Sequence, residues 1–167
     1  MPVKKDLLKD KFLDPKAYNT VFINHEDEEK AKKELMNILV ELICDGRHQS
    51  DKNQVYAFLK EEPKAVDLLM TAINEAGPEN KRKLLLACWE ADLDCTSNIA
   101  MFVGIVMKDD FPVAIEALTC IENMHGHISS EKAGELLNQV MGMYSTQIET
   151  PKGPLLADLI ELLRKWQ

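Results

Sequence analysis

The chain of 167 residues is 46% hydrophobic and 29% charged, which fits one globular domain with a core of its own and excludes a disordered chain. It carries 20 Lys or Arg against 28 Asp or Glu, a net charge of −8 with His neutral. Because such a surface repels phosphate groups at long range, the charge argues against general binding to nucleic acid or to anionic membranes.

The sequence has no feature of a membrane or secreted protein. No apolar run approaches the roughly 20 residues that span a bilayer, and the first 14 residues lack the apolar core of a signal peptide. Four cysteines, Cys44, Cys88, Cys95 and Cys120, form no CxxC pair, which favours free and mostly buried thiols. We therefore expect a cytoplasmic protein.

The first strong helical pattern covers residues 25–46 and follows a flanking segment of residues 1–24. Asn24 is a candidate N-cap, and Gly46 is a natural stop. The apolar stripe has the i, i+3, i+4, i+7, i+8 spacing of one helix face and consists of Leu35, Ile38, Leu39, Leu42 and Ile43.

Helical patterns then recur in pairs. Residues 53–62 and 64–78 predict one pair with a break at Pro63, and we expect Gly77 to end its second helix in a left-handed conformation. Residues 79–94 and 96–110 predict the next pair, with Thr96 or Ser97 as the N-cap of the second helix.

The last part of the chain predicts three further helices. The helix over residues 112–124 places Val113, Ala117, Leu118, Ile121 and Met124 on one face. A turn follows in which Gly126 is expected to take a positive φ, and Ser129 or Ser130 opens a helix to residue 144. After the break TPKGP, we expect a C-terminal capping helix within residues 152–167, with a stripe of Leu155, Leu159, Leu162 and Trp166.

An internal echo with a shift of 32 residues suggests a helical repeat. The shift places Leu118 on Leu86, Cys120 on Cys88, Ile121 on Trp89 and Glu122 on Glu90. Helix-turn-helix units that recur with such a period are typical of an α-solenoid. We therefore predict a single all-α domain over residues 1–167, with a short solenoid of stacked antiparallel helix pairs over residues 51–146. An irregular helical bundle is the alternative, because it produces similar stripes.

The segment DDFPVAIEALTCIENM resembles the first helix of a HEAT or armadillo-like repeat. The likeness is carried by Asp110, Pro112, Val113, Ala117, Leu118 and Ile121. The neighbouring repeat departs from that pattern, because Lys81-Arg82-Lys83 stands in place of its Pro-Val portion. The resemblance implies a helical-repeat scaffold.

Motifs for catalysis or cofactor binding are missing from the sequence. It contains no Gly-rich phosphate loop, no GxSxG elbow, no HExxH and no EF-hand loop. His125 and His127 flank a glycine near Cys120, but zinc needs three or four ligands, so a polar turn is favoured over a metal site. For most of the eight methionines, core filling is favoured over a repackable binding groove. We expect no enzyme, no cofactor and no metal.

The main functional hypothesis is a scaffold that binds a protein or peptide, acting as a monomer or homodimer. In a solenoid, the second helices of successive repeats line one continuous face, here residues 66–73, 99–106 and 131–144. The negative charge favours a basic partner. Helical spacing selects the outward positions, which are Asp67, Asn74, Asn98, Met101, Glu135, Asn138 and Gln139.

Two alternatives stay open. Lys81, Arg82 and Lys83 begin a helix that also carries Trp89, and an Arg with a Trp on a concave surface is similar to the HEAT-like alkylpurine DNA glycosylases. That similarity implies DNA binding or DNA repair. The second alternative is a structural protein that self-associates through the terminal stripe from Leu155 to Trp166.

Overall fold

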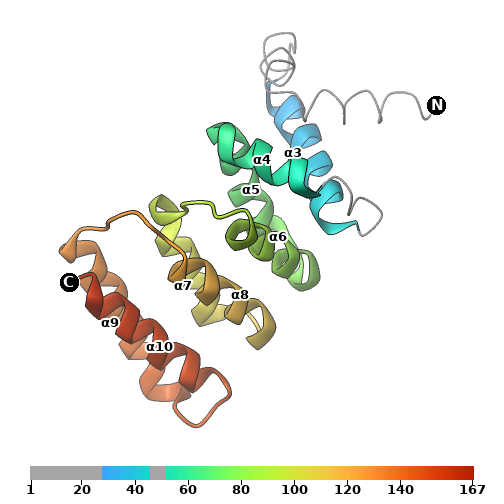
Figure 1. The fold of residues 1–167 in the computed structure, drawn as a ribbon. Helices are drawn as coiled ribbons and strands as arrows, with labels where there is room; N and C mark the ends of the chain where they lie inside the picture. Colours follow the sequence, from blue (N-terminus) through green and yellow to red (C-terminus); the bar gives the residue numbers. More distant parts are fainter. Residues whose placement is uncertain (1–27, 46–51) are drawn as a thin grey trace. The chain divides into compact units, whose positions relative to one another are not determined.

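A computed structural model describes residues 28–45 and 52–167, and this part contains eight α-helices, one 3-10 helix and no strand (Figure 1). The prediction of an all-α fold is therefore confirmed. The predicted flanking segment of residues 1–24, the candidate N-cap Asn24 and the stop at Gly46 lie outside the described residues. Within the described ranges, no helix is both long and apolar enough to cross a membrane.

The chain divides into two compact units, residues 1–91 and residues 92–167. We call them the first and the second unit. A single domain over residues 1–167 and continuous repeats over residues 51–146 stay predictions.

The first unit contains α3 (Glu28–Cys44), α4 (Lys52–Glu61), α5 (Pro63–Glu75) and α6 (Pro78–Glu90). Helix α3 packs against the other three, and α5 also packs against α4 and α6. Burying these apolar faces is the main favourable term for folding, at roughly 25 cal/mol per Å² of apolar surface. The largest fully buried side chains of the first unit are Leu35, Leu39, Leu59, Leu69, Ile73, Leu84 and Leu85.

Prolines begin two of these helices. Pro63 and Pro78 each occupy a first-turn position, where the missing N–H costs no hydrogen bond and the fixed φ suits a helix. Gly77 is the N-cap of α6, with φ −68° and ψ 166°. The expected left-handed Gly77 at the end of α5 is therefore wrong: extended backbone that any residue can adopt leads directly into Pro78.

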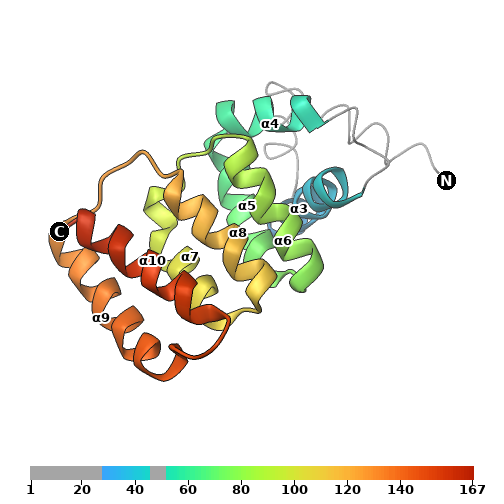
Figure 2. The same ribbon diagram turned by 60° about the horizontal axis from the view of Figure 1, so that its bottom comes forward.

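The second unit contains the 3-10 helix η2 (Thr96–Asn98), α7 (Ile99–Lys108), α8 (Phe111–Glu122), α9 (Ser130–Gln147) and α10 (Lys152–Lys165). Helices α7 and α8 form one hairpin, and α9 and α10 form another (Figure 2). The hairpins stack with α7 against α9 and α8 against α10, while α7 also contacts α10. Their shared core contains Phe102, Ile121 and Leu136.

Side-chain caps fix where two helices of the second unit begin. Asp110 accepts a hydrogen bond from the backbone N–H of Val113 at 3.1 Å, and Ser129 accepts one from that of Lys132 at 3.2 Å. Of the two serines proposed for α9, Ser129 is therefore the N-cap. The prediction that Thr96 or Ser97 caps α7 is wrong, because the N-cap is Asn98, which makes no side-chain capping bond.

Helix α8 buries the face that was predicted for it, whereas α10 does not. The five α8-face residues Val113, Ala117, Leu118, Ile121 and Met124 are all buried. Of the predicted α10 stripe, only Leu159 is buried, and Leu155, Leu162 and Trp166 are partly exposed. The buried α10 side chains are instead Leu156, Leu159, Ile160 and Leu163, because α10 packs against three helices at once.

This shift of the α10 stripe can be tested with two adjacent leucines. Leu163 is 0% exposed, so Leu163→Ala is expected to lower the free energy of unfolding by about 2–5 kcal/mol through lost burial and a cavity. Leu162→Ala, with the same chemistry at a partly exposed position, is expected to cost less than half as much. Urea unfolding followed by circular dichroism measures both, and an equal loss would contradict the observed packing.

Candidate functional site

The seven predicted partner-binding residues lie at or near the surface, in both units. Asp67 and Asn74 are exposed on α5 in the first unit. Asn98 and Met101 are partly exposed at and after the start of α7. Glu135, Asn138 and Gln139 are exposed on α9. Since α7 packs against α9, the last two groups belong to neighbouring helices of one unit.

The negative charge of the chain is concentrated in the second unit. Residues 92–167 hold 5 Lys or Arg against 11 Asp or Glu, a net charge of −6, whereas residues 1–91 hold 15 against 17, a net charge of −2. A charged surface of this kind attracts ligands of the opposite sign and raises their association rate. The second unit is therefore the part of the chain best suited to attract a cationic partner.

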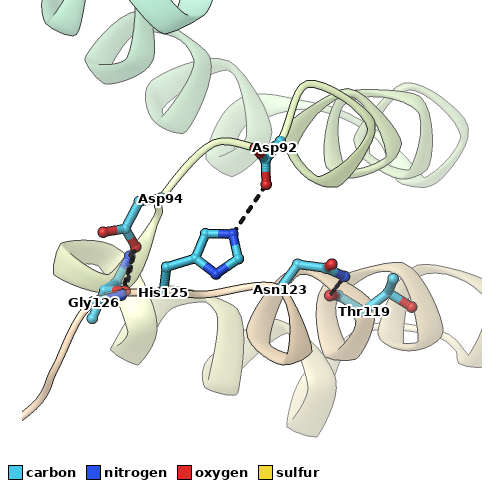
Figure 3. A network of polar contacts seen from close by, with 7 residues as sticks. Asp92, Asp94, Thr119, Asn123, His125 and Gly126 are labelled. Carbon is cyan, nitrogen blue, oxygen red and sulfur yellow. Dashed lines mark hydrogen bonds and ion pairs between the residues drawn. The ribbon is translucent and has the colours of Figure 1, made fainter.

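A network of polar contacts joins two loops of the second unit (Figure 3). The backbone N–H of Gly126 donates to the Asp94 carboxylate at 3.3 Å and to the Thr96 hydroxyl at 3.1 Å. The Thr96 hydroxyl in turn donates to Asp94. Beside this network, Nε2 of His125 lies 3.0 Å from Oδ1 of Asp92. The loop before α7 is thus held against the loop after α8.

Gly126 is needed here for space and not for its backbone angle. No described glycine has a positive φ, so the expected left-handed Gly126 is wrong. A Cβ at this position would lie 2.6 Å from the Thr96 hydroxyl oxygen and 2.9 Å from Oδ2 of Asp94. The left-handed residue of the network is Asp92, with φ 54°, a conformation that Asp tolerates better than most residues.

Hydrogen bonds from the two loops stabilise Asp94 in its ionised form. The Thr96 hydroxyl is the largest cause that lowers the pKa of this carboxyl below its ordinary 3.8, and partial burial opposes it. The backbone N–H groups of Thr96, Gly126 and His125 lower the pKa of Asp94 further. The two loops thus favour the charged form of Asp94.

The residues of the nucleic-acid hypothesis lie on α6. Arg82 is exposed, while Lys81, Lys83 and Trp89 are partly exposed. The Lys83 ammonium lies 3.1 Å from the Glu79 carboxylate and donates to the Cys44 carbonyl at 3.3 Å. This pairing reduces the positive potential that a phosphate backbone would meet.

A second polar cluster, near Trp89 in the chain, links α4 to α6. The Tyr56 hydroxyl donates to the Glu90 carboxylate at 2.6 Å, and the Lys52 ammonium lies 2.5 Å from the same carboxylate. Burial alone would raise the pKa of Glu90, but the hydrogen bonds from Lys52 and Tyr56 lower it. Burial and the contact with Glu90 raise the pKa of Tyr56. The sequence analysis missed this cluster, because its residues are 34 and 38 positions apart and belong to different helices.

The cysteines and histidines do not gather into a reactive or metal-binding group in the described residues. All four cysteines are free, and three of them are buried, as predicted. Burial raises the pKa of the Cys44 thiol to about 11, so this thiol stays protonated near neutral pH. Among the described residues, no three His, Cys, Asp or Glu side chains are placed to hold a metal ion.

Four large hydrophobic side chains are exposed in the described part of the chain. They are Phe111 at 40%, Ile115 at 38%, Met141 at 46% and Ile148 at 53%. The expectation that most methionines fill the core is wrong for the predicted helices, because only Met70 and Met124 are buried there. The spacing of Phe111 and Ile115, four residues apart and outside the buried stripe of α8, was a signal that sequence analysis could have used.

Comparison of the chain with protein-family models, with curated proteins and with solved structures finds no significant match. The fold and the site define a class no finer than an all-α protein built from helix hairpins.

The close approach at Gly126 predicts a stability effect. Gly126→Ala is expected to lower the free energy of unfolding by about 1–3 kcal/mol, because the added methyl group must displace Thr96 or Asp94. Gly142→Ala is the matched control. A Cβ at Gly142, within α9, meets no atom within 4 Å, so this change is expected to stabilise by up to about 1 kcal/mol. Thermal unfolding of both variants measures the difference in sign.

The ionised state of Asp94 predicts a pH dependence. Its pKa is lowered in the folded chain, so its contribution to stability is present above the ordinary value of 3.8 and is lost as the pH falls through the folded value. Asp94→Asn, which keeps an acceptor oxygen, is therefore expected to destabilise the protein at pH 7, and the difference from the wild type is expected to shrink as the pH falls below 3.8. Melting temperatures across this pH range test this, with Asp158→Asn on α10 as control. A destabilisation that is independent of pH would rule out the charge as its cause.

Proposed function

We propose that this chain is a non-enzymatic helical-repeat scaffold that binds another protein or a peptide. The observation that carries the proposal is the stacking of two hairpins in the second unit, α7 against α9 and α8 against α10. Helix pairs that stack in parallel layers are the building plan of HEAT and armadillo-like solenoids, whose layers present extended binding surfaces. The inference from this architecture to binding is an analogy between folds.

The proposed binding surface is the outward side of the α7–α9 layer. It contains Met101 and the exposed α9 residues Glu135, Asn138 and Gln139, and we call it the α7–α9 face. Amide side chains and a methionine can adapt their hydrogen bonds and packing to a partner. The charge of −6 on this unit supports a partner with basic character.

The test is affinity capture from the native cell lysate with the full chain and two variants of equal charge change. Asn138→Arg combined with Gln139→Arg alters the α7–α9 face by two positive charges and is expected to lose the captured protein. Asp158→Arg makes the same charge change on an exposed position of α10 and is expected to retain it. Nuclease treatment and mass spectrometry then identify what was bound.

Other outcomes would favour the alternatives. Recovery of nucleic acid alone, released by moderate salt, would move the site to Arg82 and the partly exposed Trp89 of α6. A mass in solution that rises with concentration would instead support self-association through Leu155, Leu162 and Trp166, which are partly exposed.

A further inference from the structure

Helix α8 carries a ridge of exposed and partly exposed residues spaced by four, which we call the α8 ridge. It consists of Phe111, Ile115, Thr119 and Asn123, and its first two members are the large apolar side chains that are 40% and 38% exposed. Ridges with i±4 spacing are the surfaces that helices most often use to pack against one another. The α8 ridge therefore has the geometry to receive a helix.

The polar members of the ridge are already hydrogen-bonded within α8. The Thr119 hydroxyl donates to the Ile115 carbonyl at 3.0 Å, and the Asn123 side-chain amide donates to the Thr119 carbonyl at 2.8 Å (Figure 3). Covering a polar group is costly mainly when it loses its hydrogen-bond partners. The donors of these two side chains keep an acceptor when the ridge is covered, so burial of the ridge carries a reduced desolvation cost.

Acidic residues flank the ridge at both of its ends. Asp109 and Asp110 precede Phe111, while Glu122 lies in the last turn of α8, which contains no basic residue. The loop network next to that turn adds the exposed Asp92 and Asp94.

Two lysines lie at one of the two ends. The Lys152 ammonium donates to the Met107 carbonyl at 3.1 Å, and Lys108 ends α7, so both lie toward the Phe111 end of α8. At the Asn123 end, His125 pairs with Asp92 and carries a charge only when it is protonated. Glu122 and the dipole of α8 both add negative potential at the C-terminal end of this helix.

We propose that the α8 ridge docks a basic amphipathic helix of another protein. Its apolar side chains at i and i+4 would cover Phe111 and Ile115, and its Lys or Arg residues would lie over the Glu122 end. A second copy of this chain fits less well, because it would bring two acidic units of charge −6 together. The inference rests on the proposed binding function but uses α8 in place of the α7–α9 face.

The test uses a synthetic, fluorescently labelled helix of about 18 residues, with Leu at i, i+3, i+4 and i+7 positions and Lys elsewhere. Fluorescence anisotropy with the full chain is expected to show saturable binding that weakens as salt rises from about 0.05 to 0.5 M. Phe111→Ser is expected to weaken binding about tenfold, as for an interface anchor. Ile148→Ser removes a more exposed apolar side chain, 53% against 40% for Phe111, at the C-cap of α9 and is expected to leave binding unchanged.

Three results would overturn the proposal. Equal binding of a peptide with the same composition in scrambled order would show attraction by charge alone. Unchanged binding of the peptide to Phe111→Ser would show that the ridge is not its binding site. Loss of a dimer in Phe111→Ser, measured by sedimentation, would show that a second copy occupies it.

The same measurements separate this inference from the proposed function. The α9 variant, Asn138→Arg with Gln139→Arg, is expected to lose its captured protein and to retain the synthetic helix. If the peptide does not bind but capture still depends on the α7–α9 face, only the proposal for the α8 ridge is overturned. If the peptide binds and requires Phe111, but no captured protein depends on the α7–α9 face, the proposal for the α8 ridge is supported and the proposal for the α7–α9 face is overturned.

Discussion

The second unit depends on the contact of the Gly126 backbone with Thr96 and Asp94. Its N–H donates to both side chains at 3.1 and 3.3 Å, in a space that a methyl group would fill. Because these residues lie in the loops before α7 and after α8, the contact fixes the two free ends of the α7–α8 hairpin relative to each other. The side of α8 that faces the core, and therefore the side that stays exposed, follows from this constraint together with the apolar packing of α7, α9 and α10.

Several features of the fold follow from local sequence rules. The helices in the described residues begin and end close to the predicted positions, because Pro63, Pro78 and Ser129 act through their own backbone and neighbouring N–H groups. The buried face of α8 is also local information, since Val113, Ala117, Leu118 and Ile121 form a single narrow stripe. Caps, proline positions and narrow stripes therefore carry most of what the sequence predicts correctly.

The failures have tertiary causes. Thr96 is a good N-cap residue by type, but its hydroxyl donates to Asp94 and its oxygen accepts from Gly126, thirty positions away. Helix α10 is apolar over a wide arc, and only its contacts with three other helices decide that Leu163 is buried and Leu162 is not. The echo between Trp89 and Ile121 is likewise imperfect, because Ile121 is buried and Trp89 is partly exposed. The binding residues stay predictions, because exposure selects accessible side chains without identifying a partner.

The C-terminal end of α8 carries an electrostatic cost within its own last turn. Cations are favoured at the negative end of a helix, yet the last turn of α8 ends with Glu122 and contains no basic residue. The carboxylates of Asp92 and Asp94 lie in the adjoining network, where His125 pairs with Asp92 and the Gly126 N–H donates to Asp94. Natural proteins tend to break such local rules where function requires it. If the α8 ridge binds the helix proposed above, a cationic side chain of that helix would reduce this cost, whereas an apolar or an acidic side chain would not.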